Sequence, residues 1–242
     1  MSDTRRMLAE MADPLFAQLG PAATDSDWSR LDELGLPLLL VPEADGGFGG
    51  DHVDALTVFR LAGYHALGLP LVDRIVASRT EEGSEAHFHL CAFARTAQIA
   101  GAMDAALAMS VAYVNERQQF GRPLGKFQAV QQELATFACE AAAANCAAMG
   151  AAEALDRGDA QFEIAAAKLR ANRAASEGAR IAHQVHGAIG FTQEYPLHQF
   201  TGRLRQWRSD FGGDAYWSTA LGNRVIARGA DAFWPDLTAR TD

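Results

Sequence analysis

The sequence predicts an all-α protein, and three features lead to this expectation. Long alanine-rich stretches fill much of residues 87–189, and alanine has the highest intrinsic helix propensity. Glycine and proline stops divide these stretches into segments of helical length. Almost no segment shows the two-residue alternation of an amphipathic strand. We therefore expect packed helices and no sheet.

The first part of the chain, residues 1–78, is expected to form a helical domain. Apolar side chains recur there at helical spacing, and aspartates stand where helices need N-caps. Residues 35–50 contain two prolines and end in four glycines, which indicates an extended apolar segment followed by a tight loop. The helices expected in this part lie at 4–19, about 27–33, 51–67 and 69–78.

The second part of the chain, residues 87–242, is expected to form a helical bundle. Residues 79–86 are charged and lack an apolar face, which is typical of a linker between the two parts. Small side chains on most faces of the long helices would let neighbouring helices approach closely. The helices expected in this part lie at 87–116, 126–157, 160–189, 197–210 and 215–229.

Composition narrows the possible partners and location. A net charge of −9 and an isoelectric point near 5.2 disfavour a nucleic-acid or anionic-membrane partner. The odd number of cysteines suits reduced thiols. Cys139 and Cys146 would lie about 10 Å apart along one helix axis, which is too far for a disulfide between them. No histidine set has metal-ligand spacing, no signal peptide is evident, and no stretch approaches a membrane span. We expect a soluble, cytoplasmic protein without a metal site.

Residues 115–132 place a basic, glycine-containing elbow between two of the long helices. The glycine allows a positive φ angle, and the following proline can start the next helix. An arginine, amide donors and an aromatic wall beside a helix N-terminus can together hold a phosphate and its attached group. For the arginine alone, a surface cap at a helix end is the simpler interpretation. The candidate residues are Arg117, Gln119, Phe120, Gly121, Phe127 and Gln128.

Residues 183–197 form a second candidate corner. Its glycines would let the backbone approach a ligand closely. The spacing does not match the dinucleotide-binding fingerprint and follows no strand, which excludes a Rossmann site. A plain glycine-rich helix stop is the alternative interpretation. The candidate residues are Gln184, Gly187 and Ala188.

Three segments together resemble the acyl-CoA dehydrogenase family. "RQQFGRPLGKFQAVQ" is similar to the family's Arg-x-x-Phe-Gly segment, and "QVHGAIGFTQEYP" to its Gln-x-x-Gly-Gly segment, with Ala188 at the second glycine. "LGLPLLLVPEADGGFGG" is similar to a stretch near the N-terminus of family members. The three segments occur in the family's order and cover both halves of the chain.

The resemblance implies a flavin site shared between subunits. By analogy, Arg117 would bind the pyrophosphate of FAD and the other elbow residues would shape that site. Gln184, Gly187 and Ala188 would line the adenosine region. Family members have a middle β-barrel domain between two helical domains, and this chain is expected to lack it, with only 79–86 in its place.

The residue that acts as catalytic base in the family also looks absent. Family members carry a glutamate at one of two positions, and Gly212 and Cys91 occupy these positions here. Asp210 and Asp214 flank the first position and are the candidates for a substitute base. As helix-end aspartates they would also be ordinary surface residues.

The resemblance leaves three functions open. The first is a non-catalytic subunit that completes the FAD site of a longer acyl-CoA dehydrogenase subunit, which would carry the β domain and the glutamate. Such α₂β₂ heterotetramers oxidise an acyl-CoA, in some cases with a steroid side chain, and pass electrons to an electron-transfer flavoprotein, as in lipid degradation and steroid metabolism. The second is a self-sufficient enzyme, similar to nitroalkane-oxidising relatives, with Asp210 or Asp214 as base. The third is a helical scaffold that has lost FAD.

Overall fold

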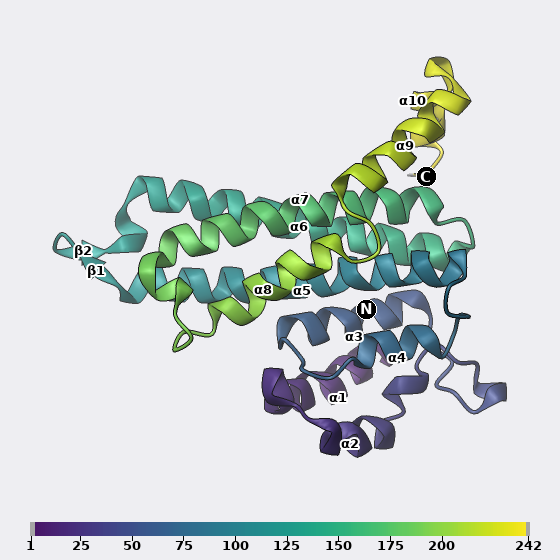
Figure 1. The fold of residues 1–242 in the computed structure, drawn as a ribbon, viewed down its shortest axis with the longest axis horizontal. Helices are drawn as coiled ribbons and strands as arrows, with labels where there is room; N and C mark the ends of the chain where they lie inside the picture. The colour runs from purple at the N-terminus through teal and green to yellow at the C-terminus, as the bar shows by residue number, and fades with distance from the viewer. Residues whose placement is uncertain (1–2, 241–242) are drawn as a thin grey trace.

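The computed structural model describes residues 3–240, and nearly all of that range is helical (Figure 1). The α-helices are α1 (Asp3–Leu19), α2 (Trp28–Glu33), α3 (His52–Tyr64), α4 (Leu71–Ala77), α5 (Glu85–Glu116), α6 (Gln128–Arg157), α7 (Gln161–His186), α8 (Leu197–Ser209), α9 (Asp214–Arg228) and α10 (Ala230–Thr238). Short 3₁₀ turns are η1 (Gly20–Ala22), η2 (Asp25–Asp27), η3 (Leu36–Leu38), η4 (Glu43–Asp45), η5 (Leu124–Lys126) and η6 (Gly187–Phe191). Two strands, β1 (Gln118–Gln119) and β2 (Arg122–Pro123), form a small antiparallel hairpin.

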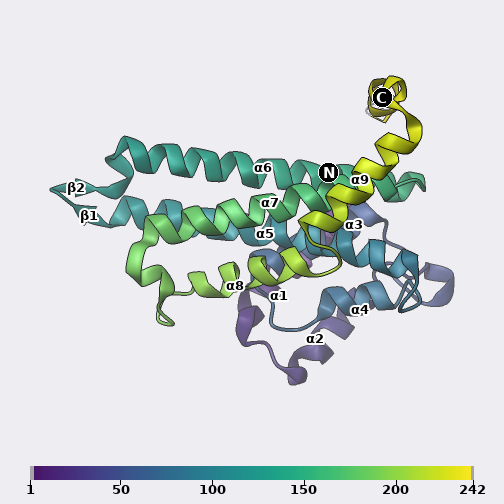
Figure 2. The same ribbon diagram turned by 45° about the horizontal axis from the view of Figure 1, so that its top comes forward.

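Helices α5, α6 and α7 are long and lie side by side, and α8 packs along them to complete a bundle (Figures 1 and 2). Local sequence sets their ends. Ser84 caps the start of α5 by accepting a hydrogen bond from the His87 N–H at 3.0 Å. Gly158, with φ of +94°, ends α6 in a left-handed conformation that glycine adopts without strain.

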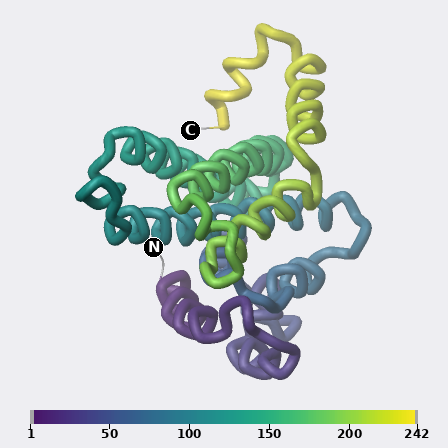
Figure 3. The backbone as a smooth tube through the Cα atoms, turned by 60° about the vertical axis from the view of Figure 1, so that its left-hand side comes forward, coloured from purple at the N-terminus to yellow at the C-terminus, as the bar shows by residue number. Residues whose placement is uncertain are grey.

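The N-terminal helices α1 to α4 cover one side of this bundle, mainly through α3 on α5 (Figure 3). Glycines make this crossing possible. A Cβ atom added to Gly63 would lie 2.1 Å from the Gln98 carbonyl oxygen, and one added to Gly101 would lie 1.9 Å from that of Arg60. Both distances are far below any real contact, so the two helix backbones touch directly at these glycines.

Helices α9 and α10 leave the bundle as an arm that rises away from α7 (Figures 1 and 2). Trp217 is the one buried residue of α9, and α10 has none. Arg240 ties the arm back to the start of α7 by bonding Glu163 at 2.7 Å and Asp159 at 3.0 Å. The sequence analysis assigned no helix to the residues of α10, which contains Pro235.

The all-α expectation is confirmed, with three local corrections. Residues 35–50 are not extended: they contain the 3₁₀ turns η3 and η4, because Pro37 and Pro42 lie where 3₁₀ turns begin. Pro123 does not start the next helix, since it lies in β2 and α6 begins five residues later at Gln128. The third long helix ends at His186, and the 3₁₀ turn η6 follows it.

The expectation that no stretch approaches a membrane span also needs correction. Within residues 3–240, both α5 and α6 are long and apolar enough to cross a membrane by length and composition. The most apolar window of α5 is 61% buried inside the protein, as expected for a core helix, whereas that of α6 is 28% buried. The three cysteines Cys91, Cys139 and Cys146 are free thiols.

Candidate functional site at one end of the bundle

The elbow between α5 and α6 is a β-hairpin rather than a plain helix stop. Gln119 pairs with Arg122 across it, and Phe120 and Gly121 form the turn with φ angles of +53° and +79°. Positive φ at both central positions defines a type I′ hairpin turn. The Leu124 N–H donates to the Arg117 carbonyl oxygen at 2.8 Å and closes the base of the hairpin. The hairpin projects beyond the end of the bundle (Figure 1).

This hairpin presents an aromatic tip and several cations to solvent. Phe120 is 89% exposed, the most exposed large apolar residue in the described chain. The Arg122 guanidinium lies 4.1 Å from the centre of the Phe127 ring, and Phe120 meets the same ring edge-on at 6.2 Å. Within residues 3–240, neither Arg117, Arg122 nor Lys126 lies within ion-pair distance of a carboxylate. The hairpin is therefore held in shape while its positive charges stay available.

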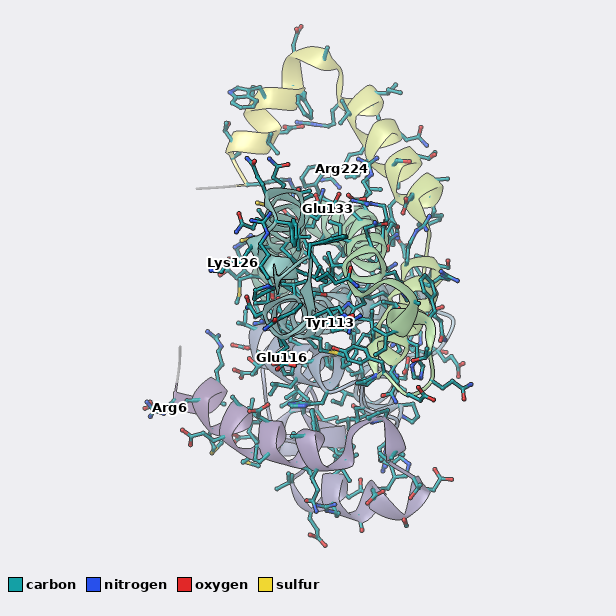
Figure 4. All side chains as sticks on the ribbon, turned by 90° about the vertical axis from the view of Figure 1, so that its left-hand side faces the viewer. Arg6, Tyr113, Glu116, Lys126, Glu133 and Arg224 are labelled. Carbon is teal, nitrogen blue, oxygen red and sulfur yellow. The ribbon has the colours of Figure 1, made fainter. Side chains whose placement is uncertain are left out.

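The structure brings the second corner to the same end of the bundle. Tyr113, one turn before the elbow, stacks on His186 with ring centres 4.6 Å apart. Tyr195, beyond η6, meets both rings, at 6.0 Å and 4.9 Å respectively. Figure 4 looks onto this end and labels Tyr113 in the bundle. Since Gly187 directly follows His186, the two sequence-predicted corners share this aromatic cluster.

Burial sets the protonation state of this cluster. It lowers the pKa of His186, opposed by the hydrogen bond to the Ala182 carbonyl oxygen, so the ring is neutral near pH 7. The Nδ1–H of His186 donates to that oxygen at 2.7 Å, which leaves Nε2 as the acceptor. The Tyr195 hydroxyl donates to Nε2 at 3.2 Å. Burial first, and Glu116 second, raise the pKa of Tyr195, so the phenol keeps its proton.

Gln184 and Gly187 line a groove of about 570 Å³ between α7 and α8. Phe191 stacks on His183 at 4.3 Å beside it and is 71% exposed. Ala188 is exposed in η6 and is not among the lining residues of this groove. The groove also contains Arg205 and Arg208, which the sequence did not single out. Their spacing of three residues on a helix was the available signal, since it places both on one face.

The first candidate position for a catalytic base is closed. Gly212 has φ of +100°, which side-chain-bearing residues rarely adopt. A Cβ atom there would lie 2.5 Å from Nε1 of Trp217 and 2.8 Å from Cδ1 of Tyr216. The Trp217 indole is 1% exposed and donates to the Phe211 carbonyl oxygen at 3.1 Å. The tryptophan thus fills the space that a side chain at position 212 would need.

The second candidate position is also unsuited to proton abstraction. Cys91 is 3% exposed, and burial raises the pKa of its thiol to about 11, with the Asp73 carboxylate adding to the effect. Its sulfur lies 3.5 Å from Nε2 of His87, whose Nδ1 is 3.0 Å from the Thr80 hydroxyl. Such a thiol stays protonated and unreactive.

Asp210 and Asp214 already have cationic neighbours. Asp210 accepts a hydrogen bond from Nε of Arg95 at 3.2 Å, and the same guanidinium bonds Asp73 at 2.7 Å. Asp214 lies in the first turn of α9, with its carboxylate 3.8 Å from Arg208. Arg95 therefore joins α4, α5 and the α8–α9 corner through partly buried ion pairs, and Asp210 is one of its structural partners.

A buried lysine completes this corner. Lys168 is fully buried, and its Nζ lies within hydrogen-bond distance of Asn172 Oδ1 and of the Trp207, Arg208 and Gly212 carbonyl oxygens, at 2.7 to 3.3 Å. Burial lowers its pKa to about 7, although Asp210 and Asp214 act in the opposite direction. Lys168 thus satisfies the carbonyls at the end of α8, which a helix leaves unpaired.

The fold and these corners define a class: an all-helical bundle with a hairpin elbow and no β domain in its described residues. A family model described as "Acyl-CoA dehydrogenase, C-terminal domain" matches residues 84–214, which is more than half of the chain. The protein therefore belongs to the acyl-CoA dehydrogenase family, as the resemblance of its motifs predicted.

Comparison with known proteins places the chain within this family. Glutaryl-CoA dehydrogenase of Desulfococcus multivorans is 40% identical over 102 residues, which is 41% of this chain and 26% of that protein. The ChsE4–ChsE5 complex of Mycobacterium tuberculosis has a similar structure, with a TM-score of 0.83, 16% identity and coverage of 95% and 98% of the two chains. A variant of the Tcur3481–Tcur3483 steroid ACAD gives a TM-score of 0.79, with 19% identity and coverage of 94% and 96%. The chain thus spans about a quarter of the length of that curated relative, and the structural matches establish the fold alone.

The residues present fit part of FAD, the cofactor that the family implies. The unpaired cations and exposed amides of the elbow suit a pyrophosphate, and the exposed Phe120 offers a face for a ring. In the described residues, no β domain is present to cover a flavin ring. Among those residues, no group of three or more metal-ligating side chains lies together.

Proposed function

We propose that this chain is the cofactor-completing, non-catalytic subunit of a heteromeric, FAD-dependent acyl-CoA dehydrogenase. A longer family member would supply the β domain, the catalytic glutamate and most of the acyl-CoA pocket. On this proposal, residues 1–78 and 87–242 are two helical domains, and 79–86 is the linker that replaces the β domain. The complex would be α₂β₂, would work in the cytoplasm and would pass electrons to an electron-transfer flavoprotein.

The observation that carries the proposal is the unpaired charge of the elbow. Arg122 lies in β2 of the hairpin, Arg117 directly precedes β1 and Lys126 lies in η5, and none of them has a carboxylate partner in the described chain. Exposed cations that have no ion pair within their own chain can form charge-assisted hydrogen bonds with a phosphate group outside it. Arg117 would bind the pyrophosphate of FAD, and Gln119 and Gln128 would add amide donors.

Two further observations support the assignment of roles. Gln184 and Gly187 line the groove between α7 and α8, and Gly187 directly follows His186, which stacks on Tyr113 one turn before the elbow. On this proposal, the two residues would receive the adenosine part of FAD. The space for a base at Gly212 is filled by Trp217, which supports a subunit that leaves proton abstraction to its partner. A steroid-bearing acyl-CoA is the substrate we favour, because the structural matches include a steroid ACAD.

Expression with and without a partner tests the proposal. The chain should be colourless when expressed alone, and should retain FAD when co-expressed with a longer family member that has a β domain and a base-position glutamate. Arg117→Glu should reduce the FAD content of the complex by at least about tenfold, which corresponds to one charge-assisted hydrogen bond. Arg157→Glu is the matched control, since that exposed arginine lies at the far end of α6 and should leave FAD retention unchanged.

The same experiment separates the alternatives. Yellow, FAD-loaded protein from this chain alone would overturn the proposal and favour a self-sufficient enzyme. In that case Asp210→Asn and Asp214→Asn would each be assayed, and unchanged turnover in both would exclude these residues as the base. A complex whose assembly and activity are insensitive to Arg117→Glu would instead favour a scaffold that has lost FAD.

A further inference from the structure

The end of the bundle remote from the elbow contains a pocket that the proposed function does not use. Its lining residues come from the first turns of α9 and from the starts of α5 and α7. The pocket has a volume of about 780 Å³, within the range of small-molecule sites. We call it the α5–α9 pocket.

Aromatic rings form one wall of the α5–α9 pocket. Phe88 lies nearly parallel to the Trp217 ring, with centres 5.8 Å apart, and meets Tyr216 edge-on at 5.5 Å. His89 adds a further ring 5.9 Å from Trp217. Tyr216 is 52% exposed although it belongs to this cluster, so part of its ring is free to contact a ligand. A flat apolar ligand packs well against such a wall.

The α5–α9 pocket is lined by one cationic and one anionic side chain, which come from different helices. Arg224 lines it from α9, with its guanidinium 5.8 Å from the centre of the Phe162 ring. In the described part of the chain, no carboxylate lies within ion-pair distance of Arg224. Glu85 lines the pocket from the first turn of α5, where the Gln161 side chain donates to its Oε1 at 3.4 Å and Nδ1 of His89 lies 3.9 Å from the same oxygen, so its other oxygen is the one available to a ligand. The pocket therefore offers a cation to an acidic group and a carboxylate to a hydrogen-bond donor.

We propose that the α5–α9 pocket binds a rigid, flat, ring-containing acid that also carries a hydroxyl group. The ring system packs on Tyr216 and Phe88, the acid group meets Arg224, and the hydroxyl donates to Glu85. This site does not depend on FAD or on a partner subunit. It lies at the start of α5, whereas the elbow follows the end of that 32-residue helix.

Calorimetric titration of the full chain with 6-hydroxy-2-naphthoate tests this site, since that probe has a fused ring with an acid at one end and a hydroxyl at the other. We expect one site per chain, with a dissociation constant below about 1 mM. Arg224→Gln should weaken binding about tenfold, and Ala220→Trp should abolish it by filling the pocket from its α9 wall. Arg173→Gln and Ala227→Trp, exposed positions outside the pocket, should bind like the unaltered chain.

Two probes that each lack one polar group test the Arg224 and Glu85 contacts separately. 2-Naphthol lacks the acid, so Arg224→Gln should not change its binding. 2-Naphthoate lacks the hydroxyl, so Glu85→Gln should not weaken its binding. The proposal is overturned if no saturable binding of 6-hydroxy-2-naphthoate occurs up to about 1 mM, or if Ala220→Trp and Ala227→Trp bind it equally.

Discussion

Two corners of the bundle have opposite characters. The elbow corner projects Phe120 and three cations into solvent, with no carboxylate partner in the described chain. The α8–α9 corner, where a base would stand, is filled: Trp217 occupies the space beside Gly212, and Lys168 lies against the carbonyls at the end of α8. Both corners derive from motifs of the same family.

The difference between the two corners indicates which of them still acts in a ligand site and which has become structural. An exposed cation without an ion-pair partner is hydrated and remains available to an anion outside the chain, whereas a buried, filled corner contributes to folding without a ligand. On the proposed function, the first corner acts in the partner's cofactor site and the second has become part of the core. Substitutions in the α8–α9 corner should therefore change the free energy of unfolding, whereas substitutions in the elbow should change FAD retention by the complex.

The largest effect is expected at Gly212. Gly212→Ala forces a Cβ atom to within 2.5 Å of the buried Trp217 ring and imposes strain at φ of +100°. The two costs together should lower the free energy of unfolding by about 3 kcal/mol. Chemical denaturation monitored by circular dichroism measures this change.

Gly213→Ala is the matched control, because Gly213 has φ of −83° and nothing within 4 Å of an added Cβ. It should change the free energy of unfolding by less than about 1 kcal/mol. Equal losses for the two variants would contradict the conclusion that Trp217 closes this corner. Gly212→Glu should be at least as destabilising as Gly212→Ala and should not create a base.

The sequence predicted the structure correctly where a backbone conformation strongly favours one residue type. Gly121 lies at positive φ as expected, because glycine has no Cβ atom to clash in a left-handed backbone conformation. The sequence shows that position 212 is not a glutamate, but it did not predict that the Trp217 ring fills the space beside Gly212. Trp217 is five residues further along the chain and reaches the corner only because α9 turns back after Gly213.

The hairpin and the arginines of the α7–α8 groove were not predicted, because their sequence signals are weak. Two-residue strands carry no alternation to detect, and Phe120 at φ of +53° contradicts the preference of aromatic residues. Arg205 and Arg208 look like an ordinary solvated helix face until α7 is placed beside them. The division of the chain at 79–86 stays a prediction.

The second-largest effect concerns pH and Lys168. Burial lowers the pKa of this lysine to about 7 in the folded protein, against 10.5 as its ordinary value. The unfolded chain therefore binds more protons between these two values, so stability rises with pH from about 7 toward 10.5. Between pH 7 and pH 9 this lysine should add about 2 kcal/mol to the free energy of unfolding.

The measurement compares urea unfolding of the unaltered chain and of Lys168→Met at several pH values. The other ionisable groups are common to both proteins, so the difference between the two curves isolates the lysine. That difference should shift in favour of the unaltered chain as pH rises above 7. A constant difference from pH 7 to pH 9 would show that the ammonium keeps its proton and that the carbonyls stabilise its charge.

A smaller effect is expected where the two candidate site segments meet. Tyr195→Phe removes the hydroxyl that donates to Nε2 of His186 at 3.2 Å and leaves that buried nitrogen without a partner. The free energy of unfolding should fall by about 1 kcal/mol. Because burial lowers the pKa of His186, its contribution to stability is lost as pH falls below about 6.5, where the unfolded chain takes up protons first.

Thermal unfolding of Tyr195→Phe at pH 7 and pH 5 measures both expectations. The variant should unfold at a lower temperature than the unaltered chain at pH 7. Tyr216→Phe is the control, since Tyr216 is 52% exposed and its hydroxyl has no hydrogen-bond partner in the described residues. Equal stability of Tyr195→Phe and the unaltered chain would mean that the aromatic cluster, rather than the hydrogen bond, joins the two segments.

The smallest effect on stability should come from the elbow, where the effect on function should be largest. Arg117→Gln removes an exposed charge with no ion pair in the described chain, so the free energy of unfolding should change by less than about 0.5 kcal/mol. FAD retention by the complex should nevertheless fall, because glutamine cannot pair with a pyrophosphate as a guanidinium does. Arg117→Lys keeps the charge without the planar fork and should restore part of the retention. A loss of stability in Arg117→Gln as large as in Gly212→Ala would mean that the elbow arginine serves this chain's own fold, and the contrast between the two corners would disappear.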